Sequence, residues 1–386
     1  MVEPITIIAP EGTVVNCRFP AAVGSGVHTV GTLITEVTHE CVAKMLFAAG
    51  LYEDVNSSWF GFAVVPIFGG VNQFGDTFGG MTLDGFAAGI GATPERDVVD
   101  TGGVMMDPTS NVSDVEMIEM NLPFVYLGRK QAMDSGGFGM FGGYATALQE
   151  TRFAHNSKIR EWFKESRSPA SFQDLEKLEG KLIDTPHCFP VRPINNYDLI
   201  ANRGCAGGGY GDPLDRSPEK VCEDVRMSVI SPDTAGKVYG VVMNPETFEC
   251  NASETEALGK KIREEKIKEG KQLKDRIQFN GKNKTALLRI HENLEVVEKE
   301  DHKKVIRCIR CGYDFCESED NYKLYSLLRE RTLTDIRLRS LISGDPIFVL
   351  YQEYICPECG TLLEVDNYST DLDKGGPILW DIQVKN

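Results

Sequence analysis

The sequence predicts an α+β fold, in which a charged helical linker joins a mixed, glycine-rich α/β module to a small β-rich domain. Three observations lead to this prediction. Glycine and aromatic residues are interspersed with short apolar runs over residues 1–252, charged residues dominate residues 253–278, and two Cys-x-x-Cys pairs lie within residues 279–386. We therefore place the domain boundaries at these three ranges.

Composition and charge limit the classes of function. Of the 386 residues, 41% are hydrophobic, so the chain has room for a sizeable core. A formal net charge of -16 argues against nucleic acid or an anionic membrane surface as a partner. Residues 1–8 have no basic segment, and no stretch approaches the roughly 18 consecutive apolar residues of a membrane helix. We expect a cytoplasmic protein without a signal peptide.

The first hundred residues predict a hairpin, a helix and a glycine-rich region. β-Branched residues around a Pro-Glu-Gly turn indicate a hairpin over residues 5–20. Residues 29–50 have the helical spacing of a core-facing stripe and end at a glycine. Short strands and tight turns are expected over residues 59–91. The helix stripe consists of Leu33, Val37, Cys41, Met45, Leu46 and Ala49, and a core role is favoured over a substrate pocket for Phe74, Phe78 and Phe86.

A short helix expected over residues 111–123 carries Glu116 and Glu119, three positions apart on one face. Such a pair can position a substrate group or a metal, but a solvated face or a cap explains it as well, and the structural role is slightly favoured. A strand at 124–127 and then a second glycine turn should follow. The candidate residues of this turn are Asp134, Gly136 and Gly137.

Residues 151–185 are expected to be helical and then polar. The adjacent pair His187-Cys188 follows in a proline-rich loop. Neighbouring residues seldom face each other productively, and no third partner is evident, so catalysis by this pair is not favoured.

The most distinctive segment is RGCAGGGYGDPLDRSPEKV, residues 203–221. Its glycines admit positive φ and let the backbone lie against a ligand or another chain. Two helices should follow, with Ser217 and Ser231 as N-caps and proline directly after each. Arg203 has the donors to hold a carboxylate or phosphate, or to fix the loop by an ion pair. The other candidate residues are Gly207, Gly208, Gly209 and Asp212, the last better suited to capping a turn than to moving protons.

The two cysteine pairs are Cys308 with Cys311 and Cys356 with Cys359, each followed by glycine. Each Cys-x-x-Cys turn forms a knuckle with two thiolates, and two knuckles complete a tetrahedral site for Zn²⁺. Because four protein ligands leave no open position, this zinc should be structural, in a zinc-ribbon-like domain.

A redox pair would need only one such motif, and the nearby Cys316 is interpreted as an ordinary apolar residue. Strands are expected in this domain at 287–290, 351–355, 362–365 and 376–381, and residues 253–278 should form a solvent-bridging helix.

Residues 207–221 and 229–242 (GGGYGDPLDRSPEKV and VISPDTAGKVYGVV) resemble the C-terminal signature of the hydantoinase B/oxoprolinase family. Residues 10–26 and 114–144 resemble earlier segments of that family, the latter with the arrangement of its acetone and acetophenone carboxylase branch. The first module would then be the C-terminal half of a hydantoinase B-like fold. The cysteine-bearing domain is similar to the small γ subunit of acetone carboxylase.

The resemblance implies a subunit of an ATP-dependent ketone carboxylase, in which an enolate or enol phosphate is carboxylated with CO₂ from bicarbonate. The implied partners are a hydantoinase A-like subunit that uses ATP and a separate chain with the N-terminal half of the hydantoinase B-like fold. No Walker-type motif occurs in the chain, so ATP, together with any divalent metal, is expected on partner subunits. Alternatives are an ATP-dependent cyclic amide hydrolase and a non-catalytic scaffold. The residues expected to shape the shared site are Glu116, Glu119, Asp134, Gly136, Gly137, Arg203 and Asp212.

Overall fold

The structure, a computed structural model, describes most of both predicted modules. The described residues are 6, 8–13, 15–21, 31–59, 67–82, 89–99, 114–129, 133–140, 150–155, 158–166, 181–184, 193–196, 198–203, 207–281, 283–332, 335, 349–370, 376–382 and 384. All strand ladders among these residues are antiparallel and are accompanied by a few helices, so the predicted α+β class is confirmed.

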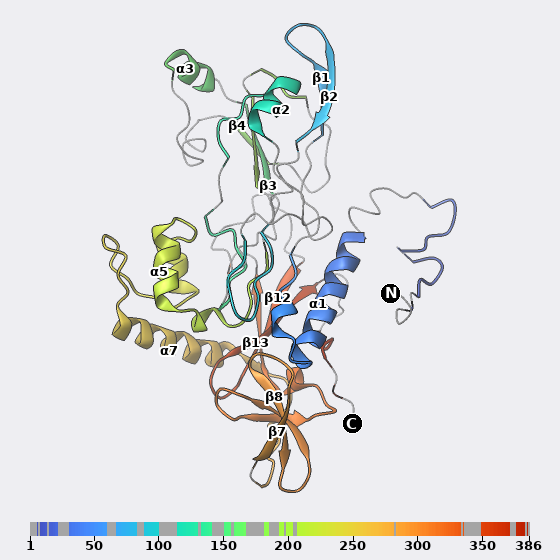
Figure 1. Cartoon of the computed structure of the whole chain (residues 1–386), viewed down its shortest axis with the longest axis vertical. Coiled ribbons are helices and arrows are strands. Elements are labelled where there is room, and N and C mark those ends of the chain that lie inside the picture. The colour runs from blue at the N-terminus through green and yellow to red at the C-terminus, as the bar shows by residue number, and fades with distance from the viewer. Residues whose placement is uncertain are drawn as a thin grey trace.

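The described part of the first module up to residue 203 contains helix α1, a 3-10 turn, a hairpin, a three-stranded sheet and the short helices α2 and α3. The hairpin β1–β2 and helix α2 lie near one end of the long axis in Figure 1. The sheet has the strand order β4-β3-β5. The bounds are α1 Thr32–Ala48, η2 Tyr52–Asp54, β1 Ile67–Val71, β2 Thr77–Met81, α2 Val115–Asn121, β3 Glu150–His155, α3 Lys158–Lys164, β4 Lys181–Asp184 and β5 Asp198–Arg203.

After the glycine loop come η4 (Pro213–Asp215), α5 (Pro218–Arg226) and α6 (Pro232–Lys237). Apolar residues of α5 and α6 form a compact core with the segment that follows them, which includes Tyr239 and Val241. A disulfide between Cys222 and Cys250 ties α5 to the segment that leads into helix α7 (Ala252–Glu269).

The second module packs two four-stranded sheets, with strand orders β10-β9-β8-β7 and β13-β12-β11-β6. Its core holds three tyrosines and Phe315 among aliphatic residues. Strands β7 and β8 form the other end of the long axis (Figure 1). The bounds are β6 Lys271–Gln272, β7 Asn283–Arg289, β8 Leu294–Lys299, β9 Lys304–Cys308, β10 Asp314–Glu317, η5 Tyr322–Tyr325, β11 Leu327–Thr332, β12 Val349–Ile355 and β13 Leu362–Ser369.

Several local predictions are confirmed. The acidic helix forms as α2, with Asp114 as its N-cap. The charged run forms α7 only as far as Glu269, because Lys271–Gln272 form β6 and pair with β11. No residue of this fully described helix is buried. Strands expected at 287–290, 351–355 and 362–365 appear as β7, β12 and β13.

Other predictions are wrong. Residues 124–127 and 376–381 form no strand, and the described part of 5–20 contains a turn with one isolated bridge, Thr13 to Asn16. The helix expected at the start of 151–185 forms only as α3, after strand β3. Ser217 stands at the N-cap of α5, but its hydroxyl donates to Glu219 instead of capping the helix. Phe74 is exposed at the hairpin tip, whereas Phe78 packs on Phe124, and Phe86 lies outside the described residues.

The orientation predicted for α1 is also wrong. Val37, Cys41 and Met45, expected to face the core, are exposed, whereas Ala43 and Phe47 are buried. Leu46 of the predicted stripe does pack on this core. The helix therefore forms where the sequence predicts it, but presents the opposite face to the core of this chain.

Candidate functional site

Four cysteines come together in the second module. The Sγ atoms of Cys308, Cys311, Cys356 and Cys359 all lie within 4.8 Å of one another. Cys308 and Cys359 Sγ are 3.9 Å apart, and Cys311 and Cys356 Sγ are 3.6 Å apart. Four thiol groups at this separation fit a tetrahedral metal site with sulfur ligands.

The two knuckles have the same backbone geometry. In the first, Gly312 N–H donates to Cys308 O (2.9 Å), and in the second Gly360 N–H donates to Cys356 O (3.0 Å). Both glycines have positive φ, +79° and +71°. One knuckle connects β9 to β10 and the other connects β12 to β13, so a bound metal would join the two sheets. Cys316 lies in the core between them, and burial raises the pKa of its thiol to about 12.

The turn after the glycine loop docks against both knuckles. Asp215 pairs with Arg310, which lies between Cys308 and Cys311 in the sequence. Asp212 accepts a hydrogen bond from the backbone N–H of Leu362, just beyond the second knuckle (2.9 Å). The turn that follows the glycine loop is therefore held by residues that flank the two cysteine knuckles.

Helix α7 reinforces this joint. Arg263 Nη1 donates to Asp212 (2.8 Å), Arg263 Nη2 donates to Asp215 (2.8 Å), and Lys266 Nζ lies 3.7 Å from Asp212. Burial alone would raise the pKa of the Asp212 carboxyl, but Lys266, Arg263 and two backbone N–H donors together lower it. Asp212 is therefore held as a buried carboxylate.

The glycine loop packs backbone against backbone. A Cβ on Gly207 would lie 1.9 Å from Ile90 O, and a Cβ on Gly137 would lie 2.3 Å from Gly209 N. Glycine is thus required because other segments of this chain approach too closely for a side chain. The hydrogen bonds of this crossing include Ala92 N to Gly208 O (2.9 Å), Gly208 N to Ser58 O (3.0 Å), Gly137 N to Gly207 O (3.3 Å) and Ser57 Oγ to Gly209 O (2.8 Å).

Arg216 is a buried anchor that sequence reasoning missed. Its guanidinium donates to both oxygens of Asp97 (2.6 and 3.2 Å) and to Asp224 (2.8 and 3.1 Å), and to Met140 O (3.3 Å). This fork of donors connects four separate segments around the glycine loop. Its place in the distinctive GDPLDRSP run was the signal that could have identified it.

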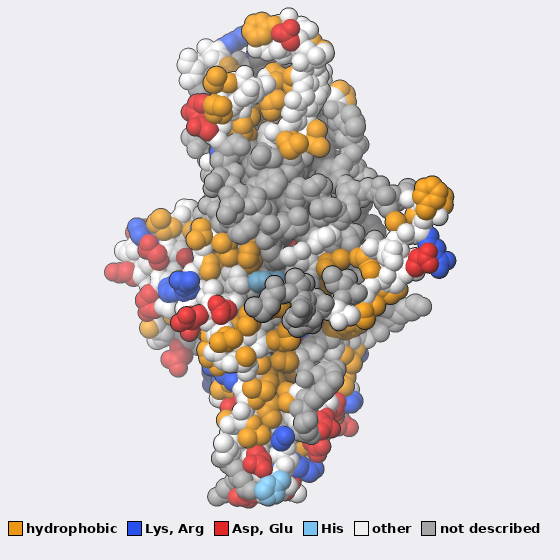
Figure 2. Space-filling model, turned by 45° about the vertical axis from the view of Figure 1, so that its right-hand side comes forward, with side chains coloured by type: hydrophobic (Ala, Val, Ile, Leu, Met, Phe, Trp, Pro, Cys, Tyr) orange, Lys and Arg blue, Asp and Glu red, His pale blue; other side chains and the backbone are white. Residues whose placement is uncertain are grey.

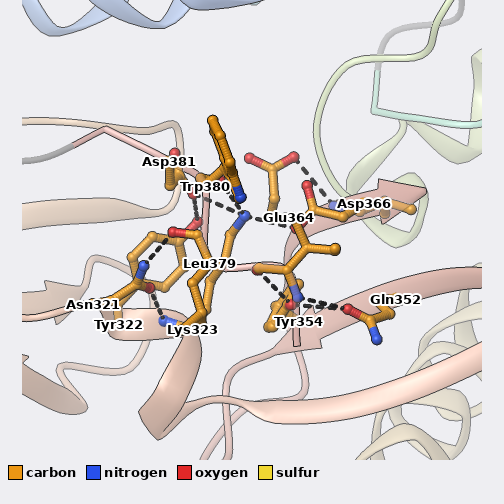
Figure 3. A network of polar contacts seen from close by, with 12 residues as sticks. Asn321, Tyr322, Lys323, Gln352, Tyr354, Glu364, Asp366, Leu379, Trp380 and Asp381 are labelled. Atoms are coloured by element: carbon orange, nitrogen blue, oxygen red, sulfur yellow. Dashed lines mark hydrogen bonds and ion pairs between the residues drawn. The ribbon is translucent and has the colours of Figure 1, made fainter. Parts of the chain in front are cut away.

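A second buried polar network joins α1 to the second module. Lys44 pairs with Glu364 of β13 and lies 3.1 Å from Asp381. Asp381 also accepts from the Tyr322 hydroxyl (2.6 Å) and lies 3.4 Å from Lys323 Nζ. Figure 3 shows Lys323 at the centre, reaching Asp366 (2.7 Å) and the Trp380 carbonyl (2.9 Å).

The carboxyl groups of this network differ in pKa. For Asp381, burial would raise the pKa, but Lys44 and Lys323 hold it below its usual range. For Asp366, burial outweighs Lys323 and, with the repulsion of Glu364, raises the pKa to about 6. Burial also raises the pKa of Glu40 on α1 and of Glu292, which shares a hydrogen bond with Tyr210 of the glycine loop.

The candidate residues outside the cysteine cluster whose side chains the structure describes fall into two groups. Asp134, Gly136, Gly137, the loop glycines and Asp212 lie in or beside the backbone crossing; Asp134 accepts from Ser231 N (2.8 Å). Glu116 and Glu119 lie on α2, toward the hairpin end in Figure 1, where Glu119 accepts from Tyr126 N (2.6 Å). Arg203 ends β5, and its side chain, like the pair His187-Cys188, lies outside what the structure describes.

The two buried networks pair residues that are far apart in sequence. Lys44 and Glu364 are 320 positions apart, and Asp212 and Leu362 are 150 apart. No local spacing signals such pairs. The sequence singles out a residue of these contacts only where that residue lies within a glycine or cysteine motif.

None of the described helices combines the length and apolar character that a membrane crossing needs. The fold and the site define an α+β protein in which a cluster of four cysteines that could hold a metal ion lies beside the turn that follows a glycine-rich loop. The family model described as hydantoinase B/oxoprolinase matches residues 1–213, and the model described as acetone carboxylase gamma subunit matches residues 282–385. The chain is a member of the hydantoinase B/oxoprolinase family that also carries an acetone carboxylase γ-type module.

Two curated relatives are carboxylase subunits. The chain is 26% identical over 252 residues to the acetone carboxylase alpha subunit of Xanthobacter autotrophicus, an alignment covering 52% of this chain and 32% of the relative. It is 24% identical over 282 residues to the acetophenone carboxylase delta subunit of Aromatoleum aromaticum, covering 62% and 41%. The chain therefore spans well under half the length of either relative.

A solved structure supports the fold. The nucleotide-free structure of acetone carboxylase matches 60% of this chain and 37% of its own chain, with a TM-score of 0.54 and 21% identity. At this identity the likeness concerns the fold alone.

Proposed function

We propose that this chain is a subunit of an ATP-dependent ketone carboxylase complex, which joins bicarbonate-derived CO₂ to the enolate or enol phosphate of a ketone. The observation that carries the proposal is the union of the two modules. The γ-type cysteine module is locked to the glycine loop by Asp212, Asp215 and Arg310. A γ-type module is associated with acetone carboxylase by its family description, and both curated relatives above are carboxylase subunits.

Zn²⁺ at the four cysteines would act as a structural centre, since all four ligands come from the protein. We propose that it stiffens the two knuckles on which the glycine loop rests. ATP, and any divalent metal that accompanies it, would be bound by a hydantoinase A-like partner, and a further chain would carry the N-terminal half of the hydantoinase B-like fold. The domain boundaries 1–252, 253–278 and 279–386 remain our proposal.

The residues proposed to shape the shared site are Glu116, Glu119, Asp134, Gly136, Gly137, Arg203 and the loop glycines. Asp212 belongs to the same region, and its buried contacts support a positioning role. A closed, dry site would protect an activated phosphate intermediate from water.

The test is native purification of the complex, with its subunits identified by mass. The complex is then assayed for fixation of labelled bicarbonate that depends on both ATP and a ketone. Acetone and acetophenone are the first substrates, with controls that lack ATP or ketone. Fixation of labelled bicarbonate with either ketone is the expected result. ATP-dependent opening of a cyclic amide without fixation would instead assign the complex the hydantoinase or oxoprolinase activity of its family.

A scaffold role is the second candidate, and it is supported by the contacts that occupy Glu119, Asp134 and Asp212. The four substitutions Glu116→Gln, Glu119→Gln, Asp134→Asn and Arg203→Gln distinguish a catalytic role from a scaffold role. Full activity of all four variants in an intact complex would favour the scaffold.

A further inference from the structure

Helix α1 has an unusual distribution of charge. Among its side chains that the structure describes, the charged residues and the histidine are all at least partly buried: Glu36, His39, Glu40 and Lys44. Every exposed residue in the helix is uncharged: Ile34, Val37, Thr38, Cys41, Val42 and Met45. Solvent-facing surfaces of helices in water normally show the reverse arrangement.

The exposed residues form a continuous stripe. Ile34, Val37, Cys41 and Met45 stand at i, i+3, i+7 and i+11, so they share one side of a helix with 3.6 residues per turn. This side lies opposite Ala43 and Phe47, which pack into the core of the chain. Ile34 is 48% exposed, Val37 65% and Met45 58%. Figure 2 shows separate areas of hydrophobic side chains at the level at which α1 lies in Figure 1, and a band of them below, over the second module.

Helix α7 provides an internal comparison of similar length, 18 residues against 17. Its outer face carries the ion pairs Lys260–Glu264 and Lys261–Glu265. The same chain thus contains a helix suited to solvent contact on its outer face. A helix that is apolar on both its inner and outer faces is suited to burial on both.

We propose that the uncharged face of α1 is the docking surface for the polypeptide segment that completes the hydantoinase B-like fold, and that a helix of this segment lies along it. The relatives above have more than half of their length outside the part that this chain matches, so the family fold includes polypeptide that can cover α1. The stripe spacing suits ridges-into-grooves packing, and the small side chains Thr38 and Cys41 allow a close approach.

This position also connects the docked segment to the rest of the site. The inner face of α1 packs Phe47 against Tyr210 of the glycine loop, and its flank binds the second module through Lys44. A segment lying on the outer face would therefore be separated from the glycine loop by the thickness of one helix. The inference rests on the partner set of the proposed function, but not on the reaction.

The test is site-specific photocrosslinking in the full chain, expressed in its source cells. A benzophenone amino acid replaces Val37 or Met45, and Lys261 on the outer face of α7 is the matched control position. We expect severalfold more crosslinking at Val37 than at Lys261, because only Val37 would lie within the docked contact, whereas the Lys261 side chain is exposed on α7. Mass spectrometry should place the crosslinked peptide in a hydantoinase B-like sequence outside residues 1–386, in the same polypeptide or in another.

Crosslinking to a second copy, to residues 1–386 of the same chain or to an unrelated protein would overturn the proposal. So would crosslinking at Val37 no stronger than at Lys261 in a complex that still assembles. Because the readout is a crosslinked peptide, a complex without carboxylase activity leaves this result intact.

A second variant tests the energetics. Val37→Glu should weaken association with the completing segment at least about tenfold, whereas Lys261→Glu should leave it unchanged. Circular dichroism of both variants reports whether the chain has folded. Unchanged association of a folded Val37→Glu variant would also contradict the proposal.

Discussion

The substitution Asp212→Asn tests whether the turn after the glycine loop is a structural joint between the two modules. Both oxygens of the fully buried carboxylate are engaged. Oδ1 accepts from Leu214 N (3.0 Å) and lies 3.7 Å from Lys266 Nζ, while Oδ2 accepts from Leu362 N (2.9 Å) and Arg263 Nη1 (2.8 Å). An amide has the same shape, but it can accept on one side only and presents an NH₂ group to the donors on the other.

The cost follows from these contacts. Removing one partner of a buried ion pair costs about 3–5 kcal/mol, because the remaining charges stay buried without a counter-ion. A buried backbone N–H left without an acceptor costs about 1–3 kcal/mol. These terms concern the same atoms, and Arg263 keeps its contact with Asp215, so we expect a total near the lower end, about 3 kcal/mol.

The measurement is the free energy of unfolding of the full chain in urea, with circular dichroism as the signal. The matched control is Asp233→Asn, which removes the same charge from an exposed i,i+4 pair with Lys237 and should cost about 0.5 kcal/mol or less. A loss below about 1 kcal/mol for Asp212→Asn would refute the joint. Lost activity with unchanged unfolding would instead indicate that Asp212 acts at the reacting atoms.

Three further outcomes are expected. The purified chain should contain tightly bound zinc by elemental analysis, and Cys311→Ser should lose it; a metal-free wild-type chain that stays folded would contradict the structural site. Gly137→Ala should lower the free energy of unfolding by about 2 kcal/mol or more, because the new Cβ would clash with the backbone of the glycine loop. The control Gly236→Ala places a Cβ in helix α6 with nothing within 4 Å, and it should raise the free energy of unfolding by up to about 1 kcal/mol. Because the pKa of Asp366 is raised to about 6 from 3.8, its contribution to stability is full below about pH 4 and is lost as pH rises through 6. Unfolding free energies from pH 4 to 7 should therefore decline relative to those of Asp366→Asn by up to about 3 kcal/mol, and a constant difference would exclude this titration.

Features that depend on short spacing could be predicted from the sequence. The two cysteine knuckles need a few consecutive residues and a glycine with positive φ, so their geometry is encoded locally. Helix α7 was predictable for a similar reason, since its alternating charges exclude a core position. The strand expected at 124–127 failed because a strand needs a neighbour, and no local pattern shows whether one is present.

The error on α1 has a different cause. Periodicity identifies Val37, Cys41 and Met45 as residues that share a side, but it does not say which body of protein will cover that side. The inner face is chosen by contacts such as Lys44 with Glu364 and Asp381, which depend on residues more than 300 positions away. Likewise, the loop glycines were expected to lie against a ligand or another chain, whereas the structure shows that segments of the same chain make the close approach at Gly137 and Gly207.

The charged contacts between the modules have a consequence for stoichiometry. Burying Lys44 and Asp212 at a boundary between separate proteins would require the binding energy to offset both desolvation and the lost translational freedom of two bodies. In one polypeptide most of the loss of translational freedom is avoided. The linker holds the two modules at an effective concentration on the order of millimolar, as other short tethers do. Covalent fusion thus fixes the two modules in a one-to-one ratio and makes a polar, desolvated boundary sustainable at any dilution.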